Sequence, residues 1–214
     1  MIGRTNCGAG GSGSAAVTIN APKNSTVSWT GTESGSVSMG SLTQASITMK
    51  PGTYSFVCKL TVNGAETTIF SKTAAVTKGA VVNLYPDGAL YWYGMTIHPL
   101  IASGNVVPTL TYNANSLHIE ARPSGYDTYY SYARAEIDVT SYVSMHCIGV
   151  NGARNNWQFG IDASKQTIPS AYGEATLDVA SLTGTQPAGL QGNVRNPGAS
   201  EWTYNADVYA LWLE

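Results

Sequence analysis

Aromatic and acidic side chains are concentrated in the segment Tyr126-Asp-Thr-Tyr-Tyr130. A tyrosine ring has a flat apolar face and a hydroxyl at its edge, and a carboxylate accepts hydrogen bonds from hydroxyl groups. This combination suits contact with a sugar ring, although such aromatic residues can equally fill a core or a subunit interface. The candidate contacts for a glycan or a partner are Tyr126, Asp127, Tyr129, Tyr130, Trp157 and Trp202.

Carboxylates are frequent in the same half of the chain, and a pair of them about 5–10 Å apart is the catalytic apparatus of a glycosidase. Asp138 and Asp178 each stand at the end of an expected strand, ahead of Val-Thr-Ser and Val-Ala-Ser. At such positions aspartate commonly accepts hydrogen bonds from turn amides. Glu120 and Glu136 alternate with apolar neighbours, which predicts solvent-facing strand positions. Because no pair stands out, we expect a protein that is not an enzyme, with a polysaccharide depolymerase as a remote alternative.

Motifs for metal, cofactor or nucleophilic chemistry are missing from the sequence. His98, His118 and His146 are isolated and lack the spacing of metal ligands. There is neither a Gly-x-Ser-x-Gly nucleophile elbow nor a phosphate-binding Gly-x-x-x-x-Gly-Lys loop. The three cysteines are far apart, and Cys58 and Cys147 lie in apolar runs that predict burial. We therefore expect no metal and no cofactor.

The charge of the chain is low and unevenly distributed. Only 11% of the 214 residues are Asp, Glu, Lys or Arg, against ~25% in an average soluble domain. Residues 1–85 hold six basic and two acidic residues, whereas residues 86–214 hold five basic and eleven acidic ones. Neither half has a basic cluster interleaved with aromatics, so we expect no nucleic-acid partner. No apolar run approaches the ~20 residues that span a bilayer, so we expect no membrane insertion.

Short alternating runs divided by turn residues fill residues 15–85 and predict a β-sandwich. The expected strands lie at 17–19, 26–29, 46–49, 54–60, 67–70, around 76 and at 81–84. Asn63-Gly64 predicts a hairpin, because both central residues of a type I′ turn need a positive φ. Residues 1–14 are rich in Gly and Ser and form a separate arm.

Three segments of this region carry a resemblance to a known class of module. Val17-Thr-Ile-Asn-Ala-Pro22, Thr26-Val-Ser-Trp29 and Lys50-Pro-Gly-Thr-Tyr-Ser-Phe56 together resemble PEGA-like and other immunoglobulin-like surface modules. The resemblance covers residues 15–85. It implies a sandwich in which the Pro-Gly-Thr-Tyr segment turns into a strand whose tyrosine packs inward. Such modules are typically spacers, so no catalysis is implied.

Residues 86–214 contain further strand candidates after a break at Tyr85-Pro-Asp-Gly88. They lie at 109–112, 117–121, 130–139, 145–150, 157–161, 175–179, 190–194 and 208–213. Residues 95–107 are expected to form a long loop. Eight strands are typical of a jelly roll. The predicted fold is therefore all-β, with two tandem antiparallel β-sandwiches, an immunoglobulin-like one over 15–85 and a jelly roll over 86–214.

Two stretches of the second region are similar, Ala135-Glu-Ile-Asp-Val-Thr-Ser-Tyr142 and Ala175-Thr-Leu-Asp-Val-Ala-Ser-Leu182. Each ends a strand in a turn that precedes a hydrophobic anchor. The arrangement resembles galactose-binding-like jelly rolls, which include carbohydrate-binding modules and the β-sandwiches of bacteriophage appendages. The aromatic and acidic loops of this region are the basis of an alternative hypothesis, an adhesin or receptor-binding module whose jelly roll recognises host surface polysaccharide.

The complete layout resembles structural proteins of bacteriophages that infect Firmicutes. It comprises the glycine-rich arm, the PEGA-like module and a jelly roll that ends in Tyr209-Ala-Leu-Trp-Leu-Glu214. The resemblance implies a fibre or decoration subunit of a phage head or tail, homo-oligomeric and expected to be a trimer. We expect Ile2, Arg4 and Asn6 to dock on other virion proteins. The start of the sequence lacks an apolar signal region, so we expect synthesis in the host cytoplasm and a place in the virion.

Overall fold

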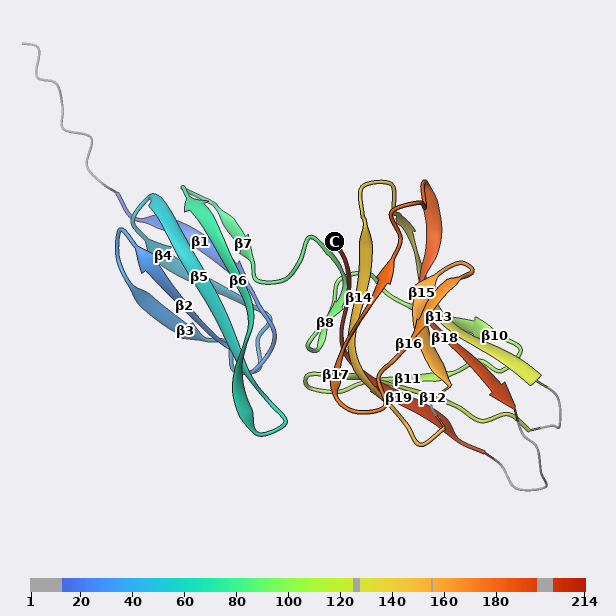
Figure 1. Ribbon diagram of the computed structural model, residues 1–214. Coiled ribbons are helices and arrows are strands. Elements are labelled where there is room, and N and C mark those ends of the chain that lie inside the picture. The colour runs from blue at the N-terminus through green and yellow to red at the C-terminus, as the bar shows by residue number, and fades with distance from the viewer. Residues whose placement is uncertain (1–12, 125–127, 155, 196–201) are drawn as a thin grey trace, which may run out of the picture. The chain divides into compact units, whose positions relative to one another are not determined.

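The computed structural model describes residues 13–124, 128–154, 156–195 and 202–214 (Figure 1). Every regular element in these residues is a β-strand, and the predicted all-β fold of antiparallel sandwiches is confirmed. The chain divides into two compact units, Met1–Leu84 and Tyr85–Glu214. Within the described ranges there is no helix long and apolar enough to cross a membrane.

The first unit consists of two sheets. One has the order β4-β1-β7 and the other β3-β2-β5-β6, and all pairs are antiparallel except β1 with β7. Its strands are β1 (Ala15–Asn20), β2 (Thr26–Gly31), β3 (Gly35–Ser38), β4 (Gln44–Met49), β5 (Gly52–Val62), β6 (Ala65–Val76) and β7 (Val81–Asn83). The Gly/Ser-rich β3 was not predicted, because it has one apolar residue, Val37, and takes its shape from pairing with β2.

Alternating side chains of both sheets build the core of this unit. Val17 of β1 and Met49 of β4 meet Val27 of β2 and Phe56 of β5, and all four are buried. Tyr54 also points inward, as the resemblance to PEGA-like modules implies, and its hydroxyl donates to the carbonyl of Lys50 at 2.9 Å. A buried tyrosine is thereby accommodated without an unpaired hydroxyl.

The hairpin between β5 and β6 turns at Asn63-Gly64, as predicted. Both residues have positive φ, 51° and 80°, and Val62 pairs with Ala65 across the turn. These angles match the requirement of a type I′ turn. The turn fixes the register of two strands that pair over most of their length.

The second unit has a five-stranded sheet, β10-β13-β18-β15-β16, and a seven-stranded sheet that contains β11-β12-β19-β14-β17. In the latter, β8 pairs with both β19 and β9. The strands are β8 (Gly88–Trp92), β9 (Met95–Thr96), β10 (Ile101–Gly104), β11 (Thr109–Tyr112), β12 (Leu117–Ala121), β13 (Thr128–Asp138), β14 (Ser144–Asn151), β15 (Trp157–Ile161), β16 (Ser164–Thr167), β17 (Gly173–Asp178), β18 (Thr185–Arg195) and β19 (Tyr204–Leu213).

The predicted loop 95–107 contains two strands, β9 and β10, so that prediction was wrong. The sequence of β10 is Ile-Ala-Ser-Gly, which is too short and too poor in apolar residues to give an alternating pattern. Its strand conformation follows from pairing with β13, in which Ile101 lies opposite Arg134 and Ser103 opposite Tyr132. The local sequence therefore gave less information here than the tertiary context.

The two similar stretches close one end of this unit against each other. Asp138 accepts hydrogen bonds from the hydroxyl and the amide of Thr140, and Asp178 accepts one from the amide of Ala180, as predicted for turn aspartates. The hydrogen bond from the Thr140 hydroxyl, and next in size the one from its amide, hold the pKa of Asp138 below its usual value. Reciprocal backbone bonds then link the turns, from Val139 N to Gly184 O and from Val179 N to Val143 O.

The turn at Asn63-Gly64 gives a test of backbone strain. At Gly64 an added Cβ would meet no atom within 4 Å, but φ is +80°. We expect Gly64→Ala to lower the free energy of unfolding by about 1 kcal/mol, since an L side chain disfavours this backbone region. Asn63→Gly at the neighbouring position should change the free energy of unfolding by only about a few tenths of a kcal/mol. Urea unfolding measures both, and an equal effect of the two changes would contradict the assignment of strain to Gly64.

Candidate functional site

The outer face of the five-stranded sheet carries a row of functional side chains along β13. Side chains alternate between the two faces of a strand. Ser131, Ala133 and Ala135 face the core, so the intervening positions face away from it. These outward residues are Tyr130, Tyr132, Arg134 and Glu136.

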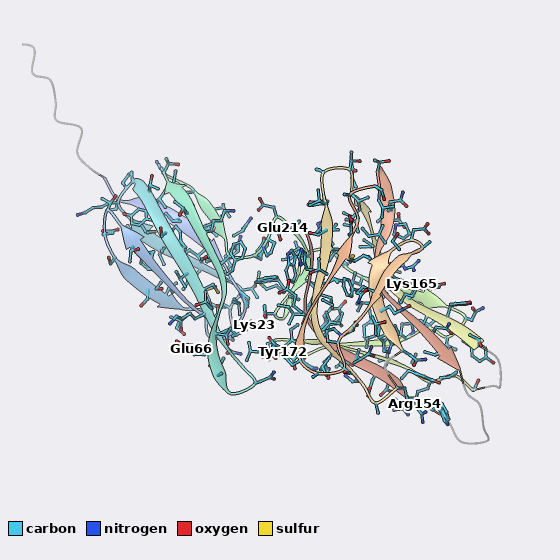
Figure 2. The ribbon with its side chains drawn as sticks, viewed as in Figure 1. Lys23, Glu66, Arg154, Lys165, Tyr172 and Glu214 are labelled. Atoms are coloured by element: carbon cyan, nitrogen blue, oxygen red, sulfur yellow. The ribbon has the colours of Figure 1, made fainter. Side chains whose placement is uncertain are left out.

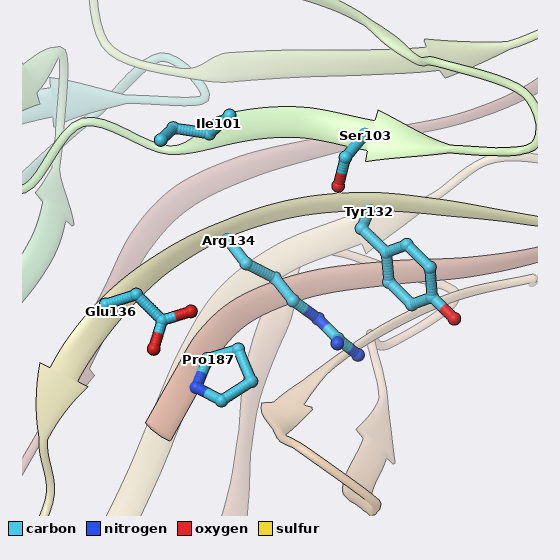
Figure 3. A pocket seen from close by; sticks show the side chains of 6 residues that line it. All are labelled: Ile101, Ser103, Tyr132, Arg134, Glu136 and Pro187. Carbon is cyan, nitrogen blue, oxygen red and sulfur yellow. The ribbon is translucent and has the colours of Figure 1, made fainter. Parts of the chain in front are cut away.

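Pairing with the neighbouring strands surrounds this row. Ile101 and Ser103 of β10 lie on one side of it, opposite Arg134 and Tyr132. On the other side, Pro187 of β18 is opposite Glu136, and Gln191 is opposite Tyr132. Together they leave a hollow of about 280 Å³, shown in Figure 3, which is lined by Ile101, Ser103, Tyr132, Arg134, Glu136 and Pro187.

The aromatic part of the row is a stack of π systems and a cation. The rings of Tyr130 and Tyr132 are nearly parallel, with centroids 6.4 Å apart and planes inclined by 9°. The Arg134 guanidinium lies over the ring of Tyr132, with its Cζ 4.1 Å from the ring centroid. A cation at this distance is attracted by the negative face of the ring. Tyr130 is 44% exposed and leaves ring surface for a ligand.

The position of Arg134 depends on the strand beside it. Gly189 lies directly opposite, and Gly160 of β15 follows in the same row, so neither adds a side chain there. Gly189 has a φ of 152°, and a Cβ would stand 2.3 Å from the carbonyl oxygen of Ala133. The guanidinium reaches across this gap and donates from Nη2 to Oε1 of Gln191.

The electrostatics of Arg134 are unusual for a surface arginine. Burial lowers the pKa of the guanidinium, and the neighbouring Tyr132, Asp162 and Glu136 partly counter this effect. The group remains charged, because arginine does not deprotonate in proteins. Its Nε is buried and has no hydrogen-bond partner among the described residues. A buried donor without a partner costs free energy, which makes this atom a marker for a missing acceptor.

Further polar groups extend the same face. Residues opposite each other in adjacent strands share a face. Asn193 is therefore beside Tyr130, and Gln158 of β15 is beside Gln191. Thr167 of β16, which pairs with Gln158, and Lys165, which is labelled in Figure 2, complete the face at its far edge. Most of these groups are neutral amides and hydroxyls, which both donate and accept hydrogen bonds.

The structure separates the predicted contact residues. Tyr130 lies on this face, whereas Tyr129 is on the opposite side of β13 and packs against the core. Tyr126 and Asp127 are outside the described residues, as are Ile2, Arg4 and Asn6. Trp202 is partly buried, and its ring centroid lies 3.3 Å from Cζ of Arg154.

The prediction that Trp157 contacts a glycan or a partner was wrong. Its side chain is fully buried, so it cannot contact a glycan. Gly192 of β18 makes room for the ring, and Asn151 holds the backbone through bonds with Trp157 N at 3.2 Å and Trp157 O at 2.7 Å. The sequence shows a tryptophan at the start of a strand but not that a glycine faces it.

Sequence reasoning missed the central residues of the face, Tyr132, Arg134 and Gln191. A signal existed for two of them, because strict alternation from Tyr130 places Tyr132 and Arg134 on the same side. No such signal marks Gln191, which is only 7% exposed and joins the site through the pairing of β13 with β18.

A second polar cluster has the distances of a catalytic triad but lacks other requirements. Ser144 Oγ lies 2.8 Å from His146 Nε2, and His146 Nδ1 lies 2.9 Å from Glu174 Oε1. The nearby backbone amides of Val143 and Ser144 both donate to the carbonyl of Glu214, so neither is available to an oxyanion. The hollow lies on the other sheet. We interpret this cluster as a structural network.

The remaining candidates for chemistry are paired or buried. His118 Nδ1 lies 2.9 Å from Asp207 Oδ1. Cys58 and Cys147 are buried as predicted. Burial raises the pKa of the Cys58 thiol to about 11, and burial also raises the pKa of the Cys147 thiol. Such thiols behave as small hydrophobic groups. No group of three or more His, Cys, Asp or Glu that could hold a metal occurs in the part of the chain that the structure describes.

Comparison with known proteins finds similarity only among solved structures. No protein-family model and no curated protein matches the chain. One similar structure comes from a study of the promiscuous specificity of carbohydrate-binding modules from the β-sandwich superfamily; it is 16% identical, with 94% of this chain and 97% of that one covered and a TM-score of 0.42. DUF3823 family proteins from Parabacteroides merdae and Bacteroides ovatus are 11% and 13% identical, with 94% of this chain and 98% and 97% of theirs covered, and both have a TM-score of 0.29. TM-scores this low assign neither a family nor a ligand to the chain.

The glycine beside Arg134 provides a test of the site's construction. Gly189→Ala should lower the free energy of unfolding by ~2 kcal/mol, because the new Cβ meets the backbone of β13 at an unfavourable φ. Gly173→Ala is the matched control, since its Cβ would meet no atom closer than 3.7 Å. Chemical denaturation of both variants measures the difference, and equal stabilities would contradict the close approach at Gly189.

The triad-like cluster also makes a prediction. A fluorophosphonate probe labels activated serines, whereas Ser144 lacks oxyanion donors, so we expect no labelling of the folded protein. Mass spectrometry of the treated protein measures the adduct. Modification of Ser144 that is absent in Ser144→Ala would refute the structural interpretation and reopen the enzyme alternative.

Proposed function

We propose that the second unit is a non-catalytic carbohydrate-binding module whose ligand site is the outer face of β10, β13 and β18. The observation that carries this proposal is the hollow in which the ring of Tyr132 and the guanidinium of Arg134 lie beside the polar groups of Ser103 and Glu136. A sugar ring is amphiphilic, with apolar C–H faces and a rim of hydroxyls. A site for it needs both aromatic surface and hydrogen-bonding groups.

The groups on this face meet both needs. Tyr130 offers exposed ring surface, and Tyr132 forms one wall of the hollow. Ser103, Glu136 and Arg134 line the same hollow and provide donors and acceptors for hydroxyls. The volume of about 280 Å³ is just below the ~300–1,000 Å³ of small-molecule sites, which fits one or two sugar rings better than a long chain.

The setting of the module stays a prediction from sequence. We propose that the protein belongs to a phage particle as a fibre or decoration subunit, with residues 15–85 as a spacer and a homotrimer as the assembly. Docking on other virion proteins through Ile2, Arg4 and Asn6, and binding of host polysaccharide by the second unit, complete this proposal. Its support is the low charge, the glycine-rich arm and the tandem sandwiches.

A glycan array with the full chain tests the binding function, and calorimetry on the best ligand tests the site. Tyr132→Ala should weaken binding about tenfold or more, since truncation of an aromatic anchor costs ~1–3 kcal/mol. Tyr130→Ala should weaken it as well. Tyr112→Ala is the control, because Tyr112 is 47% exposed but belongs to the other sheet. Binding that survives both changes on β13 would refute the site.

A further inference from the structure

The hollow is lined by one charged hydrogen-bond donor and one charged acceptor. The donor is the guanidinium of Arg134, which lines the hollow and whose Nε has no hydrogen-bond partner among the described residues. The acceptor is the carboxylate of Glu136, which lines the hollow, is exposed, and acts on the Arg134 guanidinium through its charge. Both residues project from β13 on the same face, two positions apart, as Figure 3 shows.

Apolar surface lies beside these two groups. Ile101 is 70% exposed although it is a large aliphatic residue, and it is directly opposite Arg134 on β10. Pro187 is directly opposite Glu136 on β18. The hollow therefore presents one donor, one acceptor and two apolar walls within a few residues of each other.

We infer that this hollow binds a secondary amide, so that the preferred glycan carries acetamido groups. The inference rests on the proposed carbohydrate-binding function and names the class of sugar. The carbonyl oxygen of an acetamido group accepts from Arg134, and its N–H donates to Glu136. Its methyl group, which is on the same side of the amide as the N–H, packs on Pro187 opposite Glu136. The donor and the acceptor of the hollow then each have a partner of the matching kind.

Other sugar classes leave part of the hollow unmatched. A uronic acid would pair its carboxylate with Arg134 but place it near the negative charges of Glu136 and Asp162, which both act on this guanidinium. A hydroxyl in place of the acetamido group offers no methyl to the apolar walls. A free amine would pair with Glu136 but bring a second positive charge to Arg134. Electrostatics and burial thus both favour the neutral amide.

The test uses matched pairs of glycans on the full chain. An array that holds acetamido, plain hydroxyl and uronic acid glycans is screened first. The best polysaccharide is then chemically de-N-acetylated and measured again by calorimetry. We expect hits to concentrate among acetamido glycans, and de-N-acetylation to weaken binding about 10- to 100-fold, as loss of hydrogen bonds to charged groups would.

Variants connect this preference to the hollow. Glu136 is exposed, so Glu136→Ala should fold and should abolish most of the preference for acetamido glycans. Glu66→Ala removes an exposed carboxylate of the first unit and should change nothing. Hits spread equally over glycans without acetamido groups, or a preference that Glu136→Ala leaves intact, would overturn this inference and leave the binding function standing. An array without any hit would overturn the proposed function itself.

Discussion

The pairing of β13 with β18 is the interaction on which the second unit and its candidate site depend. The two strands are antiparallel and paired without a break from Thr128 with Arg195 to Asp138 with Thr185. This ladder places Ala133 and Leu190 in the core and Tyr132 and Gln191 on the outer face. A slip of one residue would exchange the two faces, so the buried alanines and leucine that set the register also set the site.

Within that ladder, small residues decide where the functional side chains can lie. Gly189 and Gly160 leave the middle of the outer face without side chains, so Arg134 can lie along the sheet and reach Gln191. On the inner side Gly192 accepts the ring of Trp157. The cationic group of β13 and the aromatic group of β15 are thus positioned by Gly189 and Gly192 of the central strand β18 and by Gly160 of β15. This arrangement explains why a tryptophan expected at a surface belongs to the core.

The sequence predicted the class of fold and most of the strands because their signals are local. Alternation in Tyr54-Ser-Phe-Val-Cys and the Asn63-Gly64 turn need no knowledge of partners. The role of Asp138 and Asp178 as acceptors for turn amides could be predicted in the same way. In contrast, β10 has no pattern of its own, and Gln191 reaches the site only through a partner about 60 residues away in sequence. The sequence therefore predicted only part of the candidate site: it identified Tyr130 but not Tyr132, Arg134 and Gln191 beside it.

The central claim, that the outer face of the five-stranded sheet binds glycan, is tested most directly by residue-resolved NMR of the full chain during titration with its best-binding glycan. The account predicts amide shift changes that concentrate at Ile101–Gly104, around Tyr132 and Arg134 on β13, and around Gln191 on β18. Shift changes that instead gather on β11, β12 and β19 of the other sheet, or in the first unit, would contradict it.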